Sequence, residues 1–313
     1  MKTCFLFPGQ GAQYPGMGKD LWETSPRVKE LFQLASDTTS MDLKKLLFEG
    51  SEEELKSTNN TQVAVTLVNT ASAMVLKEKG IIPEGVAGFS LGEYSALWEA
   101  GVIALKDLFP IVKARGEFME KNSRKLDTEA GAAGMAAVVG LSIDDARPVL
   151  ENLKGSVFMA NHSSPIQIVL AGTSDGLKKA EKFFEEAGAM KYVFLKVSGP
   201  FHSPLLEEAK KELESFLNQY TFNDPGKPVY ANYTGQRVTS GAEAKQNCVQ
   251  QVVSTVKWVD IEQNILDDGF ERFIETGPGS VLAGLWKSFN RKERCKAAGT
   301  LADIQKIVEE SKG

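Results

Sequence analysis

The 313-residue sequence predicts an α/β fold in which a smaller unit is inserted into a domain with a mainly parallel sheet. Short apolar strands alternate with helical segments near both ends of the chain, which is typical of parallel sheets. Between about residues 129 and 198 this alternation changes to the order β-α-β-β-α-β, the ferredoxin-like arrangement. We therefore expect a large unit, residues 1–128 and 199–313, and a small unit, residues 129–198.

The first part of the large unit begins with a buried strand. Residues 3–7 are a short apolar run that ends at Pro8-Gly9 and leads into a glycine-rich loop. Residues 61–79 are apolar around most of a helical circumference, which predicts a helix deep in the core. A short strand around Val86 and Ala87 comes next. After a turn, a helix is predicted from large side chains at helical spacing, namely Leu91, Tyr94, Leu97 and Trp98.

The small unit is predicted element by element. Residues 135–141 form a strand, and Ser142 begins a capping sequence for a helix that runs toward Leu153. Residues 157–160 and 166–170 form two strands separated by a Ser-Ser-Pro turn. Thr173 or Ser174 caps an amphipathic helix, and residues 192–197 form the last strand.

The rest of the large unit returns to alternating strands and helices. A helix is predicted from residue 202 or 203 to residue 220, a strand near Val229 and a helix over residues 259–266. A strand at Phe273 and Ile274 then leads through Gly277-Pro278-Gly279 into a further helix. The polar segments 218–227 and 239–246 are predicted to be loops.

Composition and charge limit the possible functions. The 36 Lys and Arg residues against 41 Asp and Glu give a net charge of −5, so no nucleic-acid partner is expected. No stretch reaches the roughly 18 apolar residues of a membrane span and no signal peptide is recognisable, so we expect a cytoplasmic protein without a membrane partner. The three cysteines are far apart and form no CxxC pair, which argues against a disulfide framework or a metal site.

A candidate nucleophile lies in Gly88-Phe89-Ser90-Leu91-Gly92, between a predicted strand and a predicted helix. This is the setting of a nucleophile elbow, a turn so tight that its flanking positions have no room for side chains. The serine oxygen is then held at a helix N-terminus, where the helix dipole and free N–H groups favour developing negative charge. The alternative is a Gly-Ser turn that only caps a helix, and the strand-turn-helix setting favours the nucleophile.

A serine nucleophile needs a base, and the chain has two histidines, His162 and His202. His202 lies in a predicted loop that leaves a strand and enters a helix, whereas His162 lies in a predicted turn of the small unit, where a solvated side chain is expected. We predict that His202 is the base. An α/β-hydrolase carries its histidine after the acid and near the chain end, but several elements follow His202, so the order argues against an ordinary esterase.

Arg115 lies on the apolar face of a helix predicted from residue 105 to residue 122, together with Ile111, Phe118 and Met119. A guanidinium on that face needs a partner because burying an unpaired charge is very costly. The residues leave two alternatives open. Arg115 forms an internal salt bridge or extends its stem to solvent, or it is a bidentate clamp for a substrate carboxylate.

The glycine-rich loop after the first strand matches neither common nucleotide-binding pattern. Tyr14 stands where the third glycine of a dinucleotide fingerprint would be, and Met17 follows the glycine pair Gly11 and Gly16 where a Walker loop needs a lysine. The loop can still offer backbone N–H groups to a developing oxyanion on a neighbouring nucleophile.

These segments resemble, in order and over essentially the whole chain, the malonyl-CoA:acyl-carrier-protein transacylase family and the related acyltransferase domains of polyketide synthases. The matching segments are the Phe-Pro-Gly-Gln-Gly-Ala-Gln run from Phe7, Thr61-Gln62, Gly88 to Glu93, Arg115-Gly116, Asn161, Gly199 to Ser203, and Glu275 to Gly279. The resemblance implies the family fold, a hydrolase-like α/β domain with an inserted ferredoxin-like subdomain.

The resemblance implies that Ser90 is the nucleophile, that His202 is its base and that Arg115 clamps the free carboxylate of a malonyl group. In this family a main-chain carbonyl orients the histidine in place of an acid, and the matching position is Gln251. This carbonyl explains why no acid is evident.

The resemblance also implies an oxyanion hole and a pocket. The backbone N–H groups of Gln10 and Leu91 would form the oxyanion hole, and Gln62 and Asn161 would line the pocket. Phe201, directly before the histidine, is similar to the residue of malonyl-selective members.

The implied reaction is a ping-pong transfer. The malonyl group passes from malonyl-CoA to Ser90 and then to the phosphopantetheine thiol of acyl carrier protein, supplying extender units for fatty acid or polyketide synthesis. The implied partners are the carrier protein and the coenzyme A thioester, with no bound cofactor or metal, and the chain is expected to be a monomer.

Three positions depart from the family pattern. Phe89 stands where a histidine is usual before the nucleophile, Val63 follows Gln62 where proline is common, and Ser280 replaces a lysine after Gly-Pro-Gly. None of these changes removes a catalytic group. The alternatives to a transferase are a serine esterase or thioesterase, which would release the acid to water, and a non-catalytic module of an assembly line.

Overall fold

The computed structural model describes residues 1–311 and contains two five-stranded sheets. The first sheet has the strand order β10-β9-β1-β2-β7, and every pair in it is parallel. The α/β prediction with a parallel sheet is therefore confirmed. The bounds of these strands are β1 Thr3–Phe7, β2 Gly85–Gly88, β7 Val229–Tyr230, β9 Arg272–Glu275 and β10 Cys295–Ala297.

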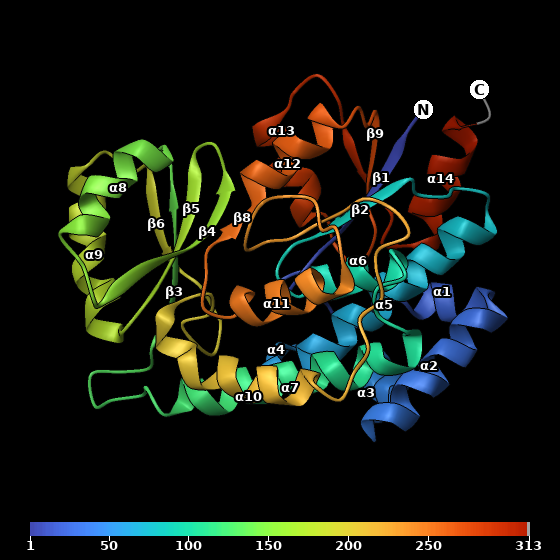
Figure 1. Ribbon diagram of the computed structural model, residues 1–313, viewed down its shortest axis with the longest axis horizontal. Coiled ribbons are helices and arrows are strands. Elements are labelled where there is room, and N and C mark those ends of the chain that lie inside the picture. The colour runs from blue at the N-terminus through green and yellow to red at the C-terminus, as the bar shows by residue number, and fades with distance from the viewer. Residues whose placement is uncertain (312–313) are drawn as a thin grey trace.

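Helices cover both faces of this sheet because alternate side chains of each strand point to opposite faces. On β1, Phe5 and Phe7 belong to the main core, whereas Cys4 and Leu6 belong to a second cluster on the other face. The main core is built on α5 (Thr58–Glu78), α6 (Gly92–Glu99) and α7 (Leu105–Arg124), and the second cluster on α12 (Trp258–Asp267) and α13 (Val281–Phe289). Figure 1 shows α12 and α13 apart from the lower helical layer.

The remaining helices of the large unit surround this core. As predicted, α5 is buried around most of its circumference. The other helices are α1 Lys19–Thr24, α2 Pro26–Thr39, α3 Leu43–Glu49, α4 Glu52–Lys56, α10 Glu207–Leu217, α11 Gly241–Gln251 and α14 Leu301–Glu310, with a short 3-10 turn at Pro204–Leu206.

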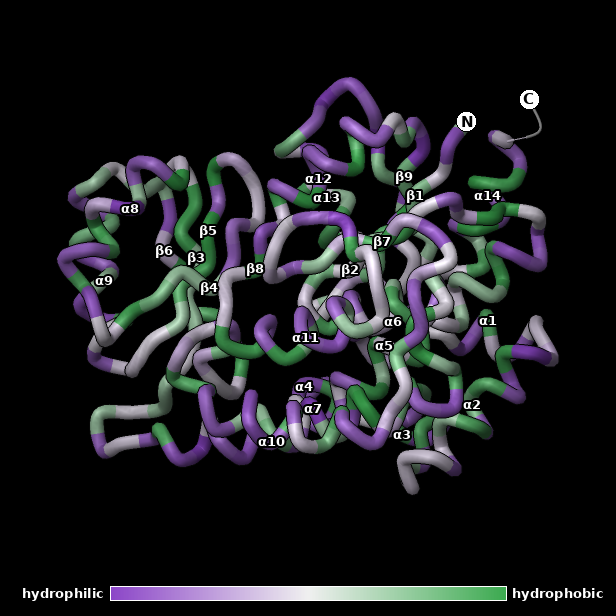
Figure 2. The backbone as a smooth tube through the Cα atoms, viewed as in Figure 1, coloured by the Kyte–Doolittle hydropathy of each residue, from purple (hydrophilic) through white to green (hydrophobic). Residues whose placement is uncertain are grey.

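The second sheet has the strand order β6-β3-β5-β4-β8. The strands of its first four positions are antiparallel and, with two helices, follow the predicted β-α-β-β-α-β order. Figure 2 shows hydrophobic residues along β3 and β5, the two central strands of these four. The elements are β3 Gly134–Val139, α8 Ile143–Glu151, β4 Val157–Ser164, β5 Gln167–Gly172, α9 Ser174–Glu186 and β6 Lys191–Phe194.

A strand from the large unit completes the second sheet. β8 (Val256–Lys257) pairs in parallel with β4 at Asn161 and His162, and Figure 1 shows it in orange beside the green strands. We propose that the unit boundaries lie at residues 128/129 and 198/199, with β8 as the element that joins the two units.

Two predictions about the local structure were wrong. β4 continues to Ser164, so Asn161 and His162 lie on a strand and not in a turn. Residues 239–246 are not a loop, because α11 begins at Gly241 with the Ser240 side chain accepting a hydrogen bond from the Glu243 N–H. The buried face of α11 includes the polar residues Asn247 and Gln251, so the helix shows little apolar periodicity in the sequence.

Within residues 1–311, no helix has both the length and the apolar character needed to cross a membrane.

Candidate active site

Ser90 lies in the turn between β2 and α6 and has a φ of 52°, the left-handed region that a non-glycine residue rarely adopts. The two glycines around it permit this turn. A Cβ on Gly88 would lie 2.0 Å from the carbonyl of Gly92, and a Cβ on Gly92 would lie 2.0 Å from the carbonyl oxygen of Phe7. Both contacts are with backbone, so side chains other than hydrogen are excluded. The tight turn predicted around Ser90 is therefore present.

Gly92→Ala is expected to destabilise the fold by at least about 3 kcal/mol, because the new methyl group overlaps β1 and neither backbone can move without shifting the sheet. The measurement is the urea midpoint of unfolding. Gly284→Ala is the matched control, since Gly284 lies in α13 with open space around it and alanine there should stabilise the helix by about 0.5–1 kcal/mol. Equal midpoints for the two variants would contradict the overlap.

The side chains of Ser90 and His202 meet directly. Ser90 Oγ lies 2.7 Å from His202 Nε2, and His202 Nδ1 lies 2.8 Å from the carbonyl oxygen of Gln251. A carbonyl can only accept, so Nδ1 carries the proton and Nε2 is left to accept the hydroxyl proton of Ser90. No carboxylate is needed to set this tautomer.

His202 is 4% exposed and has a left-handed φ of 57°. Burial, followed by the positive charge of Arg115, lowers the pKa of His202 to about 3, against the opposing effect of the Gln251 carbonyl. The imidazole is therefore neutral at physiological pH, which is the form that can accept a proton from Ser90.

Arg115 is 1% exposed on α7 and lies beside the Ser90–His202 pair. Its Nη1 donates to Gln62 Oε1 at 2.7 Å, and its Nη2 donates to Gln251 Oε1 at 2.9 Å and approaches Ser90 Oγ at 3.4 Å. The guanidinium also lies 5.4 Å from the ring centre of Tyr94. Among residues 1–311 no Asp or Glu forms an ion pair with Arg115, so the internal salt bridge considered from the sequence is not present.

The guanidinium keeps donor capacity for another group. Its Nε–H is buried without a hydrogen-bond partner, and burial lowers the pKa of Arg115 without making it a neutral side chain. A buried cation held only by neutral amides is suited to bind an anion that enters the site.

The backbone amides of Gln10 and Leu91 donate to no other group among residues 1–311. The loop that carries Gln10 runs against the turn, since a Cβ on Gly9 would lie 2.5 Å from the carbonyl oxygen of Phe89 and 3.6 Å from Leu91 N. Asn69 on α5 fixes this loop by donating to the Pro8 carbonyl at 3.0 Å. Backbone N–H groups without a partner are what a developing oxyanion needs when they lie near the reacting atom.

The other pocket residues from the sequence lie in different surroundings. Gln62 contacts Arg115 as described, and Phe201 is buried in the main core beside Gly199. Asn161 lies on β4 and is buried, but it makes no side-chain hydrogen bond to the other site residues within the described chain, and its Oδ1 has no partner. The side-chain oxygen of Asn161 is therefore a buried hydrogen-bond acceptor without a donor among the described residues.

The three departures from the family pattern also have defined surroundings. The ring of Phe89 packs on Trp258 at 5.3 Å between centres, Val63 is buried in the core, and Ser280 is exposed before α13. None of the three takes part in the Ser90, His202 and Arg115 contacts. Two polar residues that contact the turn and were not predicted as site residues are Glu93 and Asn232.

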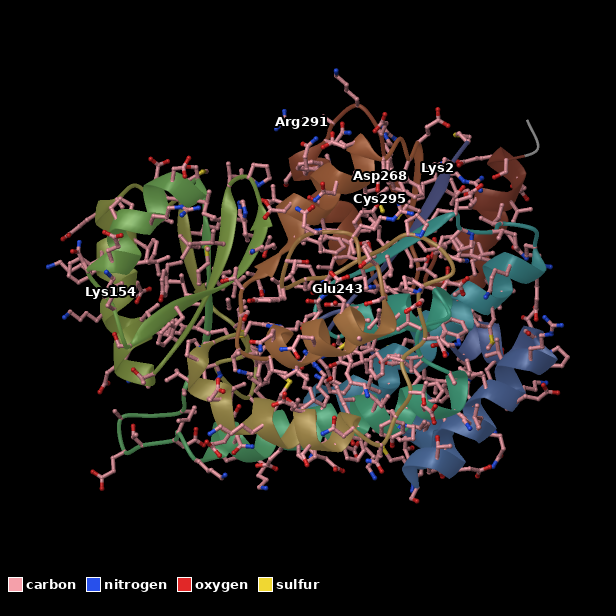
Figure 3. All side chains as sticks on the ribbon, in the orientation of Figure 1. Lys2, Lys154, Glu243, Asp268, Arg291 and Cys295 are labelled. Carbon is pink, nitrogen blue, oxygen red and sulfur yellow. The ribbon has the colours of Figure 1, made fainter. Side chains whose placement is uncertain are left out.

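A groove of about 590 Å³ leads to His202 between the two units. Its walls come from α8, β4 and the segment before α12, and they carry Arg147, Lys154 and Lys257 with one acidic side chain, Glu151. Figure 3 shows Lys154 on the small unit, away from Arg291 and Cys295 at the top of the large unit. Within residues 1–311 no cluster of three or more His, Cys, Asp or Glu side chains is arranged to hold a metal ion.

A serine on a strand-turn-helix elbow, in contact with a buried neutral histidine, defines a class: the α/β enzymes with a serine–histidine site, which includes hydrolases and acyltransferases. The buried arginine beside the serine distinguishes this site from an apolar esterase pocket.

Comparison with known proteins narrows the class. The family described as acyl transferase domain matches residues 4–310. The malonyl CoA-acyl carrier protein transacylase of Bacillus subtilis (strain 168) is 38% identical over 311 residues, which cover 98% of this chain and 96% of that protein. The chain belongs to the acyl transferase family and, within it, to the malonyl CoA-acyl carrier protein transacylases.

Solved structures agree with this assignment. A crystal structure titled MCAT from Streptococcus pneumoniae matches with a TM-score of 0.92 at 35% identity and covers 99% of this chain and 100% of that one. A type II PKS acyl-carrier protein in complex with its malonyl-transacylase matches with a TM-score of 0.93 at 34% identity, covering 99% and 100%. The chain is thus an acyltransferase with the α/β fold of these enzymes, as the sequence predicts.

Proposed function

We propose that this enzyme transfers the malonyl group of malonyl-CoA to the phosphopantetheine thiol of acyl carrier protein, supplying fatty acid or polyketide synthesis. The observation that carries the proposal is the juxtaposition of three side chains. Ser90 Oγ lies 2.7 Å from the base nitrogen of His202 and 3.4 Å from an Arg115 nitrogen, so one site combines an acyl acceptor with a carboxylate-binding group. The names of the relatives described above support the same activity.

The first half-reaction loads the enzyme. His202 Nε2 takes the proton of the Ser90 hydroxyl while Oγ bonds to the thioester carbonyl carbon, and the N–H groups of Gln10 and Leu91 stabilise the oxyanion. When the oxyanion collapses, the C–S bond breaks and the coenzyme A sulfur receives the proton from His202. The product is malonyl-Ser90, with the Gln251 carbonyl stabilising the imidazolium formed on the way.

The second half-reaction unloads the enzyme by the same groups. The phosphopantetheine thiol gives its proton to His202 and attacks the acyl-serine carbonyl, and the Ser90–acyl bond then breaks as Oγ regains the proton. Because water could attack instead of the thiol, the pocket must exclude water while the acyl group is bound.

Arg115 would select the acyl group. The malonyl carboxylate can accept from the guanidinium, whereas an acetyl group leaves it unpaired in a buried site, which is costly. Gln62 holds the guanidinium from behind. Phe201 would add an apolar wall, and the unsatisfied Oδ1 of Asn161 could accept a hydrogen bond from the substrate.

The groove suits both coenzyme A and a phosphopantetheine arm, since it leads to His202 and is lined by Arg147, Lys154 and Lys257. These cations complement the phosphates of either carrier. We propose that the protein acts as a cytoplasmic monomer, with acyl carrier protein as its partner, without nucleic acid or membrane, and with malonyl-CoA as substrate and no bound cofactor.

The function is tested by incubating the protein with malonyl-CoA or acetyl-CoA, with and without phosphopantetheinylated carrier protein, and following both proteins by intact mass. A malonyl adduct on the enzyme that moves to the carrier supports the proposal. Rapid release of free malonate without carrier would instead indicate a thioesterase. No adduct and no turnover would indicate a non-catalytic module, which the Ser90–His202 contact argues against.

Arg115→Ala is expected to lower kcat/KM for malonyl-CoA by at least about 100-fold, because it removes the only cation that contacts the Ser90 hydroxyl within the described chain. Turnover of acetyl-CoA should fall much less. Arg124→Ala is the control, since Arg124 lies at the end of the same helix and is 44% exposed. Equal losses for malonyl and acetyl substrates would indicate that Arg115 is only structural.

A further inference from the structure

Glu93 is a buried acid that the reaction described above does not use. It lies in the first turn of α6, three residues after Ser90, and is 1% exposed. Its Oε2 accepts two hydrogen bonds, one from the backbone N–H of Asn232 at 3.1 Å and one from the side-chain amide of Gln251. The first donor, Asn232, also contacts Ser90, and the second, Gln251, also contacts His202.

Asn232 braces the turn that carries the nucleophile. Its Oδ1 accepts from the Ser90 N–H at 2.6 Å, and its Nδ2 donates to the Gly88 carbonyl at 2.7 Å. One amide side chain thus spans the turn and satisfies backbone groups on both sides of Phe89. A left-handed serine costs of order 1–3 kcal/mol and persists only where its surroundings hold it, which these two bonds do.

Gln251 braces the base. Its carbonyl oxygen accepts from His202 Nδ1, and its side-chain Nε2 donates to the Ser90 carbonyl at 3.0 Å in addition to the bond with Glu93. The rotation of the Gln251 side chain is therefore fixed at both ends, because its Oε1 also accepts from Arg115.

The same amide separates two charges. Arg115 and Glu93 form no direct ion pair among the described residues, and the Gln251 amide bridges them, accepting from the guanidinium and donating to the carboxylate. A carboxylate in direct contact would occupy the donors that the substrate needs. With the amide between them, Glu93 leaves the remaining N–H groups of Arg115 free, and burial raises the pKa of Glu93 to about 7 against the opposing effect of its hydrogen bonds from Gln251 and Asn232.

We propose that Glu93 is the positioning residue of this active site, which acts on Ser90 through Asn232 and on His202 through Gln251. It does not touch the reacting atoms. It fixes the distance between nucleophile and base by accepting hydrogen bonds from both braces at one oxygen. Glu93 does not contact the imidazole of His202 directly; Gln251 lies between them and contacts both. The inference rests on the proposed function only for the identity of the acyl group.

The test measures the rate at which Ser90 reacts with a fluorophosphonate probe, which needs the Ser90–His202 pair but no malonyl group, alongside kcat and KM for malonyl transfer. Glu93→Ala is expected to lower the probe rate and kcat by about 100-fold, the effect of a displacement near 1 Å. Glu93→Gln should recover most of the rate, because its amide oxygen can accept the same two hydrogen bonds.

Asn232→Ala gives an independent measurement and carries the test if Glu93→Ala does not fold. It removes the brace on Ser90 and leaves the Glu93–Gln251 bond, so kcat should fall while KM for malonyl-CoA stays unchanged. Glu262→Ala is the matched control, since Glu262 is equally buried, on α12, with its side chain bonded to Trp258. This control should react with the probe at the wild-type rate even if its Tm is lower.

Folded Glu93→Ala or Asn232→Ala protein that reacts with the probe at the wild-type rate would overturn the inference. So would a Glu93→Gln variant as slow as Glu93→Ala, because the acceptor role would then be wrong. A wild-type protein that reacts with the probe but does not transfer malonyl would contradict the proposed function, while the probe rates would still decide the role of Glu93.

Discussion

Ser90→Ala is expected to abolish the covalent malonyl adduct and to lower transfer on the order of 10⁶-fold, the loss seen when a serine–histidine site loses its nucleophile. The serine Oγ is the group within reach of His202 Nε2, and alanine leaves the base with no hydroxyl to activate. The turn itself should survive, because the Ser90 N–H bond to Asn232 and the Gln251 bond to the Ser90 carbonyl involve only backbone atoms of residue 90. The measurement is intact mass after incubation with malonyl-CoA.

Ser288→Ala is the control for this substitution, because Ser288 is an exposed residue on α13 and its loss leaves the site untouched. The control should form the adduct as the wild type does. If the Ser90→Ala protein carries the adduct in the same amount as the wild type, another side chain accepts the acyl group.

The local part of this site could be predicted from sequence. The Gly-x-Ser-x-Gly turn is a property of consecutive residues, and its glycines are required by contacts of 2.0 Å that exclude any side chain. The N-caps of the two helices of the small unit could also be predicted, because the Ser142 and Thr173 side chains accept hydrogen bonds from backbone N–H groups three residues later. The position of Arg115 on an apolar helix face predicted that its guanidinium has a partner. The sequence did not distinguish an internal acid from a substrate carboxylate as that partner.

The parts that could not be predicted depend on contacts between distant segments. Asn232 lies 142 positions from Ser90 in the sequence, in a polar stretch with no pattern that marks it. β8 is two residues long and exists because it pairs with β4, so its sequence alone carries no strand signal. β4 continues through His162 because it pairs there with β5 on one side and with β8 on the other.

His202→Ala is expected to slow acylation of Ser90 on the order of 10⁶-fold, as in other serine–histidine sites. The loss is large because the proton of the serine hydroxyl then has no acceptor, since Nε2 at 2.7 Å is the nitrogen placed to take it. The Gln251 carbonyl that held Nδ1 remains but cannot replace the imidazole as a base. The measurement is the single-turnover rate of malonyl-enzyme formation.

His162→Ala is the matched control because His162 is the other histidine of the chain and makes no bond to Ser90. It lies half-buried on β4, where burial lowers its pKa, and its loss should leave acylation near the wild-type rate. A slow acylation rate in His162→Ala together with a near wild-type rate in His202→Ala would refute His202 as the base.

The pH dependence gives a second check on His202. Because its pKa lies at about 3, the neutral base persists as the pH falls through the ordinary histidine range, and protonation removes it only near the shifted value. The kcat/KM for acylation should therefore show no fall between about pH 8 and pH 5 that belongs to this group. In Arg115→Ala the pKa of His202 should rise, because the charge that lowers it is gone, so acid inhibition should begin at higher pH than in the wild type. A wild-type fall centred near 6.5 would show that the imidazole is not buried beside the guanidinium in the working enzyme.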